Sequence, residues 1–239
     1  MEPVPWWKWL LLSLGVIALT VVAMTMGLIA LAYQGVDFQD YLYVARPAWI
    51  TSGTVGFWIA FLIMSQSLAP LAVAALYRPA RQRAFAALRP PQNWRAVWLK
   101  VLLGGALAFV LQLVWARIGP TPEAPYRLLE HVVYAVSRGG SFWPWFWLLA
   151  AAAAVGPAAE EILYRGLVQS TIARRWGKWA GMLGSATLFG LAHGTANALP
   201  AALLGLYFSY QVEEDQSLAG PIILHALHNL AAVVAMAAR

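Results

Sequence analysis

The chain contains no cysteine, and only 11% of its 239 residues are charged. Without cysteine it cannot form a disulfide framework, a cysteine-ligated zinc site or a cysteine nucleophile. Acidic side chains are also scarce: ten Asp and Glu stand against sixteen Lys and Arg, and the formal net charge is +6. Any metal site would therefore depend on the four histidines and these few carboxylates.

Apolar residues take the place of the missing polar ones. They make up 61% of the chain, which includes thirteen tryptophans, and no ordinary soluble domain has this composition. The basic residues lie between apolar runs, as in the cytoplasmic loops of membrane proteins, and are not gathered with exposed aromatics on one soluble domain. The sequence therefore predicts an all-α polytopic transmembrane helical bundle in a lipid bilayer, with no nucleic acid as partner.

Apolar runs of about 20 residues mark the expected membrane spans. We expect about 6–8 helices in one integral-membrane domain over residues 1–239, because a further apolar run at 199–212 is either a short span or a re-entrant segment. The first run is longer than the roughly 7–15 residues of a signal-peptide core, so we expect a retained transmembrane helix there. The expected spans are residues 9–33, 49–77, 98–118, 142–172, 179–196 and 218–238.

Basic loops set the expected orientation. Residues 77–100 are rich in Arg, and Arg174, Arg175 and Lys178 form a second basic cluster. Because cytoplasmic loops carry an excess of Lys and Arg, we expect both segments in the cytoplasm. The loop with Asp37 and Asp40 and the proline-rich stretch 119–141 then face outward. The amino terminus is predicted to be cytoplasmic, and the cell membrane is the expected location.

Three polar motifs interrupt apolar segments in the second half of the chain. Ionisable groups inside a membrane cost free energy, so they are functional candidates by default. A rise of ~1.5 Å per helical residue places the first motif ~21 Å from Arg174, the second ~22 Å from Lys178, and the third ~15–21 Å from Asp215 if its helix starts there. Side chains at similar depth can converge on one site. The residues concerned are Glu160, Glu161 and Arg165, then Phe189 and His193, then His225 and Asn229.

The segment that carries the two glutamates needs a tilt or a break. A straight helix over residues 142–172 would be longer than the ~30 Å hydrocarbon core. Gly156-Pro157, just before the glutamates, predicts a break. Such a break frees backbone carbonyls and could open a water-filled cavity beside the motif.

The motifs contain the groups that peptide hydrolysis requires. Glu161 and Arg165 are an i, i+4 pair that would neutralise each other, which leaves Glu160 as the unpaired carboxylate. Glu160 and His193 could hold one water between them and deprotonate it. His225 and Asn229 lie on one face of the last helix and could both donate hydrogen bonds to an oxyanion.

The order and spacing of the motifs carry a family resemblance. Glu-Glu-x-x-x-Arg, Phe-x-x-x-His and His-x-x-x-Asn, all within residues 155–233, resemble the CAAX-protease and bacteriocin-processing (Abi) family of intramembrane endopeptidases. The resemblance implies that this segment is the catalytic core. It also implies that Glu160 and His193 activate water, Glu161 and Arg165 support the site, and His225 and Asn229 form the oxyanion hole.

The resemblance leaves the role of a metal open, because the family has been described both as metalloproteases and as metal-independent glutamate proteases. The sequence has no His-Glu-x-x-His zinc signature. We favour the glutamate type, with no cofactor. Zinc held by Glu160, His193 and His225 is the alternative, since three protein ligands suffice for catalytic zinc.

The sequence thus predicts an intramembrane endopeptidase that cleaves a membrane-associated or lipidated protein or peptide, by CAAX-type processing or by processing of a peptide or tail. The alternative is a non-catalytic membrane protein that binds or transports a peptide, such as an immunity factor or a chaperone. Catalysis is favoured because a binding protein would not need Glu160, His193, His225 and Asn229 together.

Overall fold

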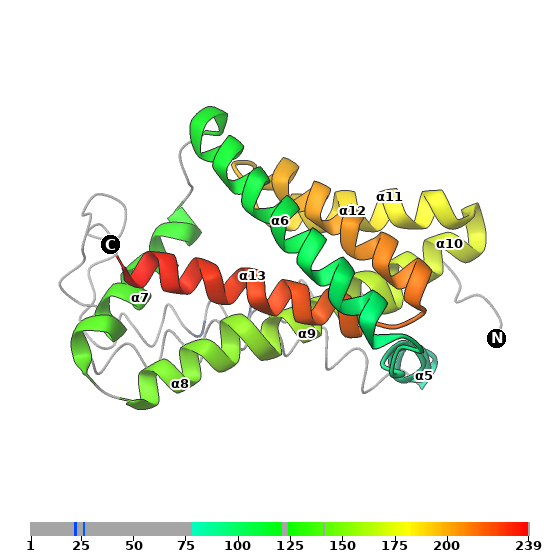
Figure 1. The fold of residues 1–239 in the computed structure, drawn as a ribbon, viewed down its shortest axis with the longest axis horizontal. Coiled ribbons are helices and arrows are strands. Elements are labelled where there is room, and N and C mark those ends of the chain that lie inside the picture. The colour runs from blue at the N-terminus through cyan, green and yellow to red at the C-terminus, as the bar shows by residue number, and fades with distance from the viewer. Residues whose placement is uncertain (1–21, 23–25, 27–77, 121–123, 141, 239) are drawn as a thin grey trace.

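The computed structural model describes residues 22, 26, 78–120, 124–140 and 142–238 (Figure 1), and this part of the chain is helical with no strand. The all-α prediction is confirmed. The expected spans 9–33 and 49–77 and the loop with Asp37 and Asp40 lie outside the described residues.

The elements are α5 (Arg78–Ala87), α6 (Trp94–Ile118), α7 (Ala124–Gly139), α8 (Phe142–Ala150), η2 (Ala151–Val155), α9 (Gly156–Glu161), η3 (Ile162–Gln169), α10 (Ser170–Trp176), α11 (Lys178–Ala192), α12 (Ala198–Asp215) and α13 (Ala219–Ala237).

Three helices of the described part are long and apolar enough to cross a membrane. They are Trp94–Ile118, the continuous 35-residue helix Phe142–Trp176, and Ala219–Ala237. They correspond to the spans expected at 98–118, 142–172 and 218–238. The short apolar run expected at 199–212 is the 18-residue helix α12, which runs on through Glu213, Glu214 and Asp215.

Two segments expected as loops contain helices. The basic segment 77–100 includes α5 and the first turns of α6. Helix α6 begins at Trp94 because Asn93 caps it. The Asn93 Oδ1 accepts hydrogen bonds from the backbone N–H groups of Arg95 and Ala96 at 3.1 and 3.2 Å. The proline-rich stretch 119–141 contains α7. Val132, Val133 and Val136 recur at helical spacing and are buried, so this amphipathic pattern outweighs the prolines before it.

The break expected at Gly156-Pro157 is absent, and that prediction was wrong. The helix continues from Phe142 to Trp176, with π-helical stretches on both sides of Gly156–Glu161. In the first stretch the Gly156 N–H donates to Ala151 O, five residues back. In the same register Ala152 O would accept from residue 157, but proline has no N–H. The wider helical turn accommodates Pro157 and leaves the Ala152 carbonyl without a backbone donor.

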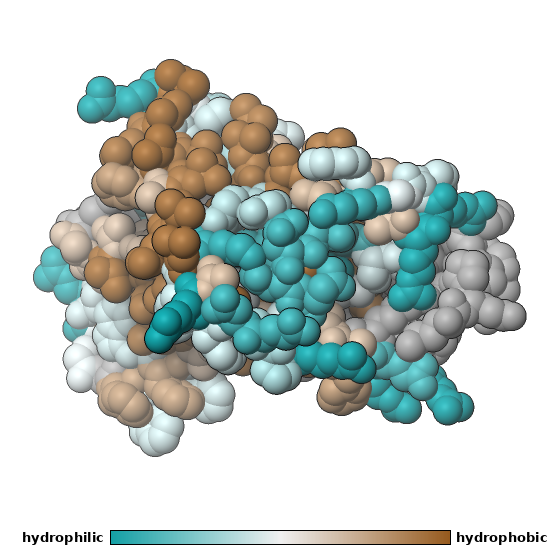
Figure 2. All heavy atoms as spheres, turned by 45° about the vertical axis from the view of Figure 1, so that its right-hand side comes forward, coloured by the Kyte–Doolittle hydropathy of each residue, from teal (hydrophilic) through white to brown (hydrophobic). Residues whose placement is uncertain are grey.

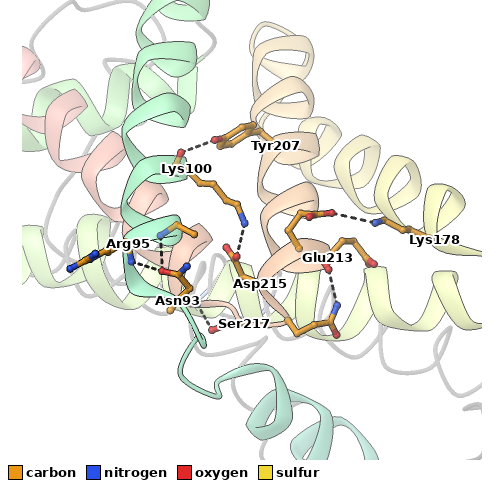
Figure 3. A network of polar contacts seen from close by, with 12 residues as sticks. Asn93, Arg95, Lys100, Lys178, Tyr207, Glu213, Asp215 and Ser217 are labelled. Carbon is orange, nitrogen blue, oxygen red and sulfur yellow. Dashed lines mark hydrogen bonds and ion pairs between the residues drawn. The ribbon is translucent and has the colours of Figure 1, made fainter.

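The helices pack around two buried apolar clusters in the described part of the chain. The smaller contains Ile162 and Leu218, and the larger is formed by Val97, Val101, Ala108, Phe189, Leu204, Phe208 and Leu224. Helix α13 lies between α6 and the α8–α9 segment (Figure 1), and α11 packs along α12. Gly177, with φ 88°, makes the turn between α10 and α11 in a conformation that favours glycine. Figure 3 shows how α6 is tied to α12: Lys100 pairs with Asp215, and the Tyr207 hydroxyl donates to Lys100 O at 2.7 Å.

The described surface carries basic and aromatic side chains around the ends of α5, α6, α10 and α11. Figure 2 shows hydrophilic side chains gathered on this face and apolar side chains above them. Tryptophans beside basic residues are typical of a membrane–water boundary on the cytoplasmic side, so the observed surface fits the expected orientation, which stays a prediction. The exposed residues are Arg78, Arg81, Arg89, Arg95, Arg174, Arg175 and Lys178, with Trp94, Trp98, Trp176 and Trp179.

Candidate active site

Glu161 and Arg165 form the buried ion pair expected from their spacing. Both side chains are fully buried, and the Arg165 Nη1 lies 3.1 Å from the Glu161 Oε1. The Arg165 Nη2 also donates to Gly205 O at 3.0 Å. The guanidinium lies 4.4 and 5.0 Å from the ring centres of Phe189 and Phe208. A carboxylate, a carbonyl and two aromatic faces thus compensate for the loss of water around this charge.

His225 joins the third motif to the first. Its Nδ1 lies 2.9 Å from the Glu161 Oε1, and its Nε2 lies 3.8 Å from the Glu160 Oε2. Because a carboxylate only accepts hydrogen bonds, Nδ1 is the donor. The imidazole is buried. His225 therefore spans the two glutamates, one bonded closely and the other at longer range.

Glu160 differs from its neighbour in the way the sequence predicts. Its side chain is 18% exposed, whereas that of Glu161 is 0% exposed. Among the described residues the Oε2 atoms of both glutamates are buried without a hydrogen-bond partner, but the Glu161 Oε1 is bonded to Arg165 and His225, whereas the Glu160 Oε2 lies 3.8 Å from the His225 Nε2. Of the two carboxylates, Glu160 is the one that a water or a substrate can reach.

The sequence predicted a helix over 179–196 with His193 inside it. In the structure His193 instead follows the last residue of α11. The helix stops at Ala192, and Gly194 follows with φ 77°. The His193 Nδ1 lies 2.8 Å from Phe189 O, a carbonyl in the last turn that lacks a partner within the helix. Since a carbonyl cannot donate, Nδ1 carries the proton, and Nε2 of the neutral ring keeps a lone pair.

The second and first motifs are linked through Phe189. Among the described residues no hydrogen bond or ion pair joins His193 directly to Glu160. The His193 ring lies 4.3 Å from the Phe189 ring, and the edge of Phe189 meets His225 at 5.7 Å. Phe189 thus contacts the rings of both histidines.

Asn229 uses the carbonyl that Pro157 leaves free. Its Nδ2 donates to Ala152 O at 2.8 Å. The expectation that Gly156-Pro157 frees a backbone acceptor is therefore correct, although the helix does not break. One N–H of the Asn229 amide is used in this bond, and the second N–H is left for another acceptor.

Helix α12 carries no motif, yet it contributes several site groups that the sequence analysis missed. Gly205 accepts from Arg165, and Phe208 packs on Arg165 and His225. Ser209 O and the Glu213 Oε1 accept from Gln169 at 3.3 and 2.9 Å. Gln169 could have been found, because it is a polar residue in an apolar span. Gly205 and Phe208 gave no such signal, since both are ordinary in an apolar helix.

The zinc alternative would require Glu160, His193 and His225 to converge on one point. Among the described residues no group of three or more His, Cys, Asp or Glu side chains is placed to hold a metal ion. Glu160, His193 and His225 are all within that part of the chain.

Comparison with protein families gives a match in the second half of the chain. Residues 141–231 match the family model of the type II CAAX prenyl endopeptidases. The segment is Rce1-like. All three motifs fall within it, so the resemblance to CAAX proteases is confirmed for this part, which is less than half of the 239 residues.

The Rce1-like segment, together with the three long apolar helices, indicates an integral membrane protein with protease activity on a protein or peptide. The same comparisons gave no match among curated proteins or among solved structures.

Proposed function

We propose that the protein is an intramembrane endopeptidase of the glutamate type, which cleaves a membrane-associated or lipidated protein or peptide without a cofactor. The observation that carries this proposal is the difference in bonding and exposure between two adjacent carboxylates. Glu161 is fully buried and its Oε1 is bonded to Arg165 and His225, whereas the Glu160 side chain is 18% exposed and lies 3.8 Å from the His225 Nε2. Purely structural pairing would not require the second, free carboxylate.

Water activation falls to Glu160 and His193. Glu160 accepts a hydrogen bond from the water, and the lone pair on the His193 Nε2 supplies a second acceptor. As the water oxygen forms its bond to the scissile carbonyl carbon, one of these groups takes up the proton. The carbonyl π electrons move to its oxygen. When the C–N bond breaks, the same proton passes to the departing amine, and the carboxylate or imidazole is regenerated.

Stabilisation of the oxyanion requires a particular charge state of His225. Its Nδ1–H is directed at Glu161, so the Nε2 can donate only if the ring is an imidazolium. Charge balance supports that state. Glu160 and Glu161 bring two negative charges and Arg165 brings one positive charge, so a protonated His225 makes the buried group neutral. The second N–H of Asn229 is the other donor.

The test is cleavage by Glu160→Gln, which keeps the size of the side chain and removes the base. We expect wild-type protein in phospholipid vesicles to cleave at least one of three fluorogenic peptides: one farnesylated at a CAAX end, its unlipidated form, and one with an apolar tail. Glu160→Gln should lose this activity and still insert and purify normally. Glu214→Gln is the control, because Glu214 is exposed and pairs only loosely with Lys178, at 3.8 Å.

The outcomes separate the two hypotheses. Cleavage at a near wild-type rate by Glu160→Gln would refute Glu160 as the base. Tight binding of a peptide by wild-type protein with no cleavage of any of the three would favour the non-catalytic alternative. The preference among the three peptides assigns the substrate class.

A further inference from the structure

Phe208 lies in α12, the helix that carries none of the three motifs, and its side chain is fully buried. Its ring faces the imidazole of His225 in a stacked arrangement, with the ring centres 5.3 Å apart and an angle of 24° between the planes. We propose that Phe208 is a positioning residue that orients the His225 imidazole for the reaction. This inference rests on the endopeptidase function proposed above.

The hydrogen bond of His225 fixes only part of its orientation. The bond from Nδ1 to the Glu161 Oε1 sets the direction of one nitrogen, but the ring plane can still turn about that bond. Two aromatic contacts restrict this rotation: Phe208 lies against the face of the imidazole, and Phe189 meets it at 84°. With the plane fixed, the Nε2 is directed toward Glu160, at 3.8 Å.

The same ring supports the second donor to Glu161. The Arg165 guanidinium lies 5.0 Å from the centre of Phe208 and 3.1 Å from the Glu161 Oε1, the oxygen that His225 also contacts. Phe208 is therefore placed beside both groups that hold this carboxylate. An aromatic face attracts cationic groups of this kind, and an aliphatic side chain of similar bulk does not.

Phe208 can act in this way because its own position is fixed. It lies between two points at which α12 is bonded to the helix with the glutamates: Arg165 donates to Gly205 O, and Gln169 donates to Ser209 O. These bonds are four residues apart on each helix and bracket Phe208 in the sequence of α12. The ring is held in register with His225 by backbone carbonyls, not only by apolar packing.

The experiment compares Phe208→Leu, which keeps apolar bulk without an aromatic face, with Phe208→Tyr, which keeps the face. Protein labelled with ¹⁵N at histidine contains only His131, His193, His225 and His228, so the ring nitrogens of His225 can be assigned from a His225→Asn spectrum. We expect Phe208→Leu to shift or broaden the His225 signals and to lower kcat by about 3- to 10-fold, with KM changed less than about twofold. Phe208→Tyr should keep the His225 signals close to wild type.

Leu204→Val is the control, because Leu204 belongs to the same helix and the same buried cluster. It should lower thermal stability slightly and leave the His225 signals and kcat unchanged. If Phe208→Leu leaves the His225 signals unchanged, or if Leu204→Val changes them equally, Phe208 has only a packing role and the inference is refuted. The spectra do not depend on turnover, so failure of the proposed function would appear separately, as wild-type protein without activity.

Discussion

The close contact between α12 and Arg165 predicts the effect of adding one methyl group at Gly205. A methyl carbon at this position would lie 2.9 Å from the Arg165 Nη2 and 3.0 Å from the Phe189 Cδ1. Both distances are shorter than van der Waals contact. Arg165 and Phe189 are themselves buried against the other site groups, so neither can move without disturbing the Glu161–Arg165 pair.

The magnitude follows from two opposing terms. Replacing a helical glycine with alanine stabilises a helix by up to about 1 kcal/mol, whereas forcing extra volume into a packed site costs about 1–3 kcal/mol. Gly105→Ala isolates the first term, because Gly105 also lies inside a helix and a methyl group there would meet nothing within 4 Å. The difference between the two variants, about 1–3 kcal/mol, is therefore the contribution of crowding at Arg165.

The assay is thermal unfolding of both variants in the same detergent, followed by cleavage of the peptides named above. For a chain of this size, about 1–3 kcal/mol corresponds to a melting temperature of Gly205→Ala roughly 2–12 °C below that of Gly105→Ala. Cleavage should fall only in Gly205→Ala, since Arg165 no longer holds Glu161. If Gly205→Ala is as stable and as active as Gly105→Ala, α12 does not approach Arg165 as closely as described.

Three further predictions concern the same site. Glu161→Gln and Arg165→Ala should each lower stability by about 3–5 kcal/mol, measured as a loss of folded yield and melting temperature, because each leaves a buried charge without its partner; normal yield of either variant would contradict the buried pair. Pro157→Ala supplies a backbone N–H that can compete with Asn229 for Ala152 O, so kcat should fall by about tenfold without loss of stability. This decrease is smaller than the ~10²–10³-fold expected for Asn229→Ala. Unchanged kcat would show that the bond between Asn229 and Ala152 O does not matter for catalysis. Activity should survive dialysis against a strong chelator, and elemental analysis should find less than one zinc per chain. If zinc is stoichiometric, follows activity and falls in His225→Ala, the metal-free mechanism is refuted, but the protease assignment is not.

The sequence by itself determined the features that depend on local spacing and on hydrophobic length. Apolar runs predicted α6, the long helix Phe142–Trp176 and α13, because a helix in lipid must satisfy its own backbone and expose apolar side chains. The i, i+4 spacing of Glu161 and Arg165 predicted their ion pair, since such residues are neighbours on any helix. It also singled out Glu160 as the carboxylate without that partner.

Only the tertiary structure decided how the site is held together. The sequence predicted a break at Gly156-Pro157, where the helix instead continues through a π-helical turn. The group that binds the Ala152 carbonyl, the Asn229 amide, comes from a helix far away in the sequence, and only the fold brings the two together. The orientation of His225 depends on Phe208 in a helix without a motif. An apolar residue in an apolar helix gives no signal of its own, because its role comes from the side chain that packs against it.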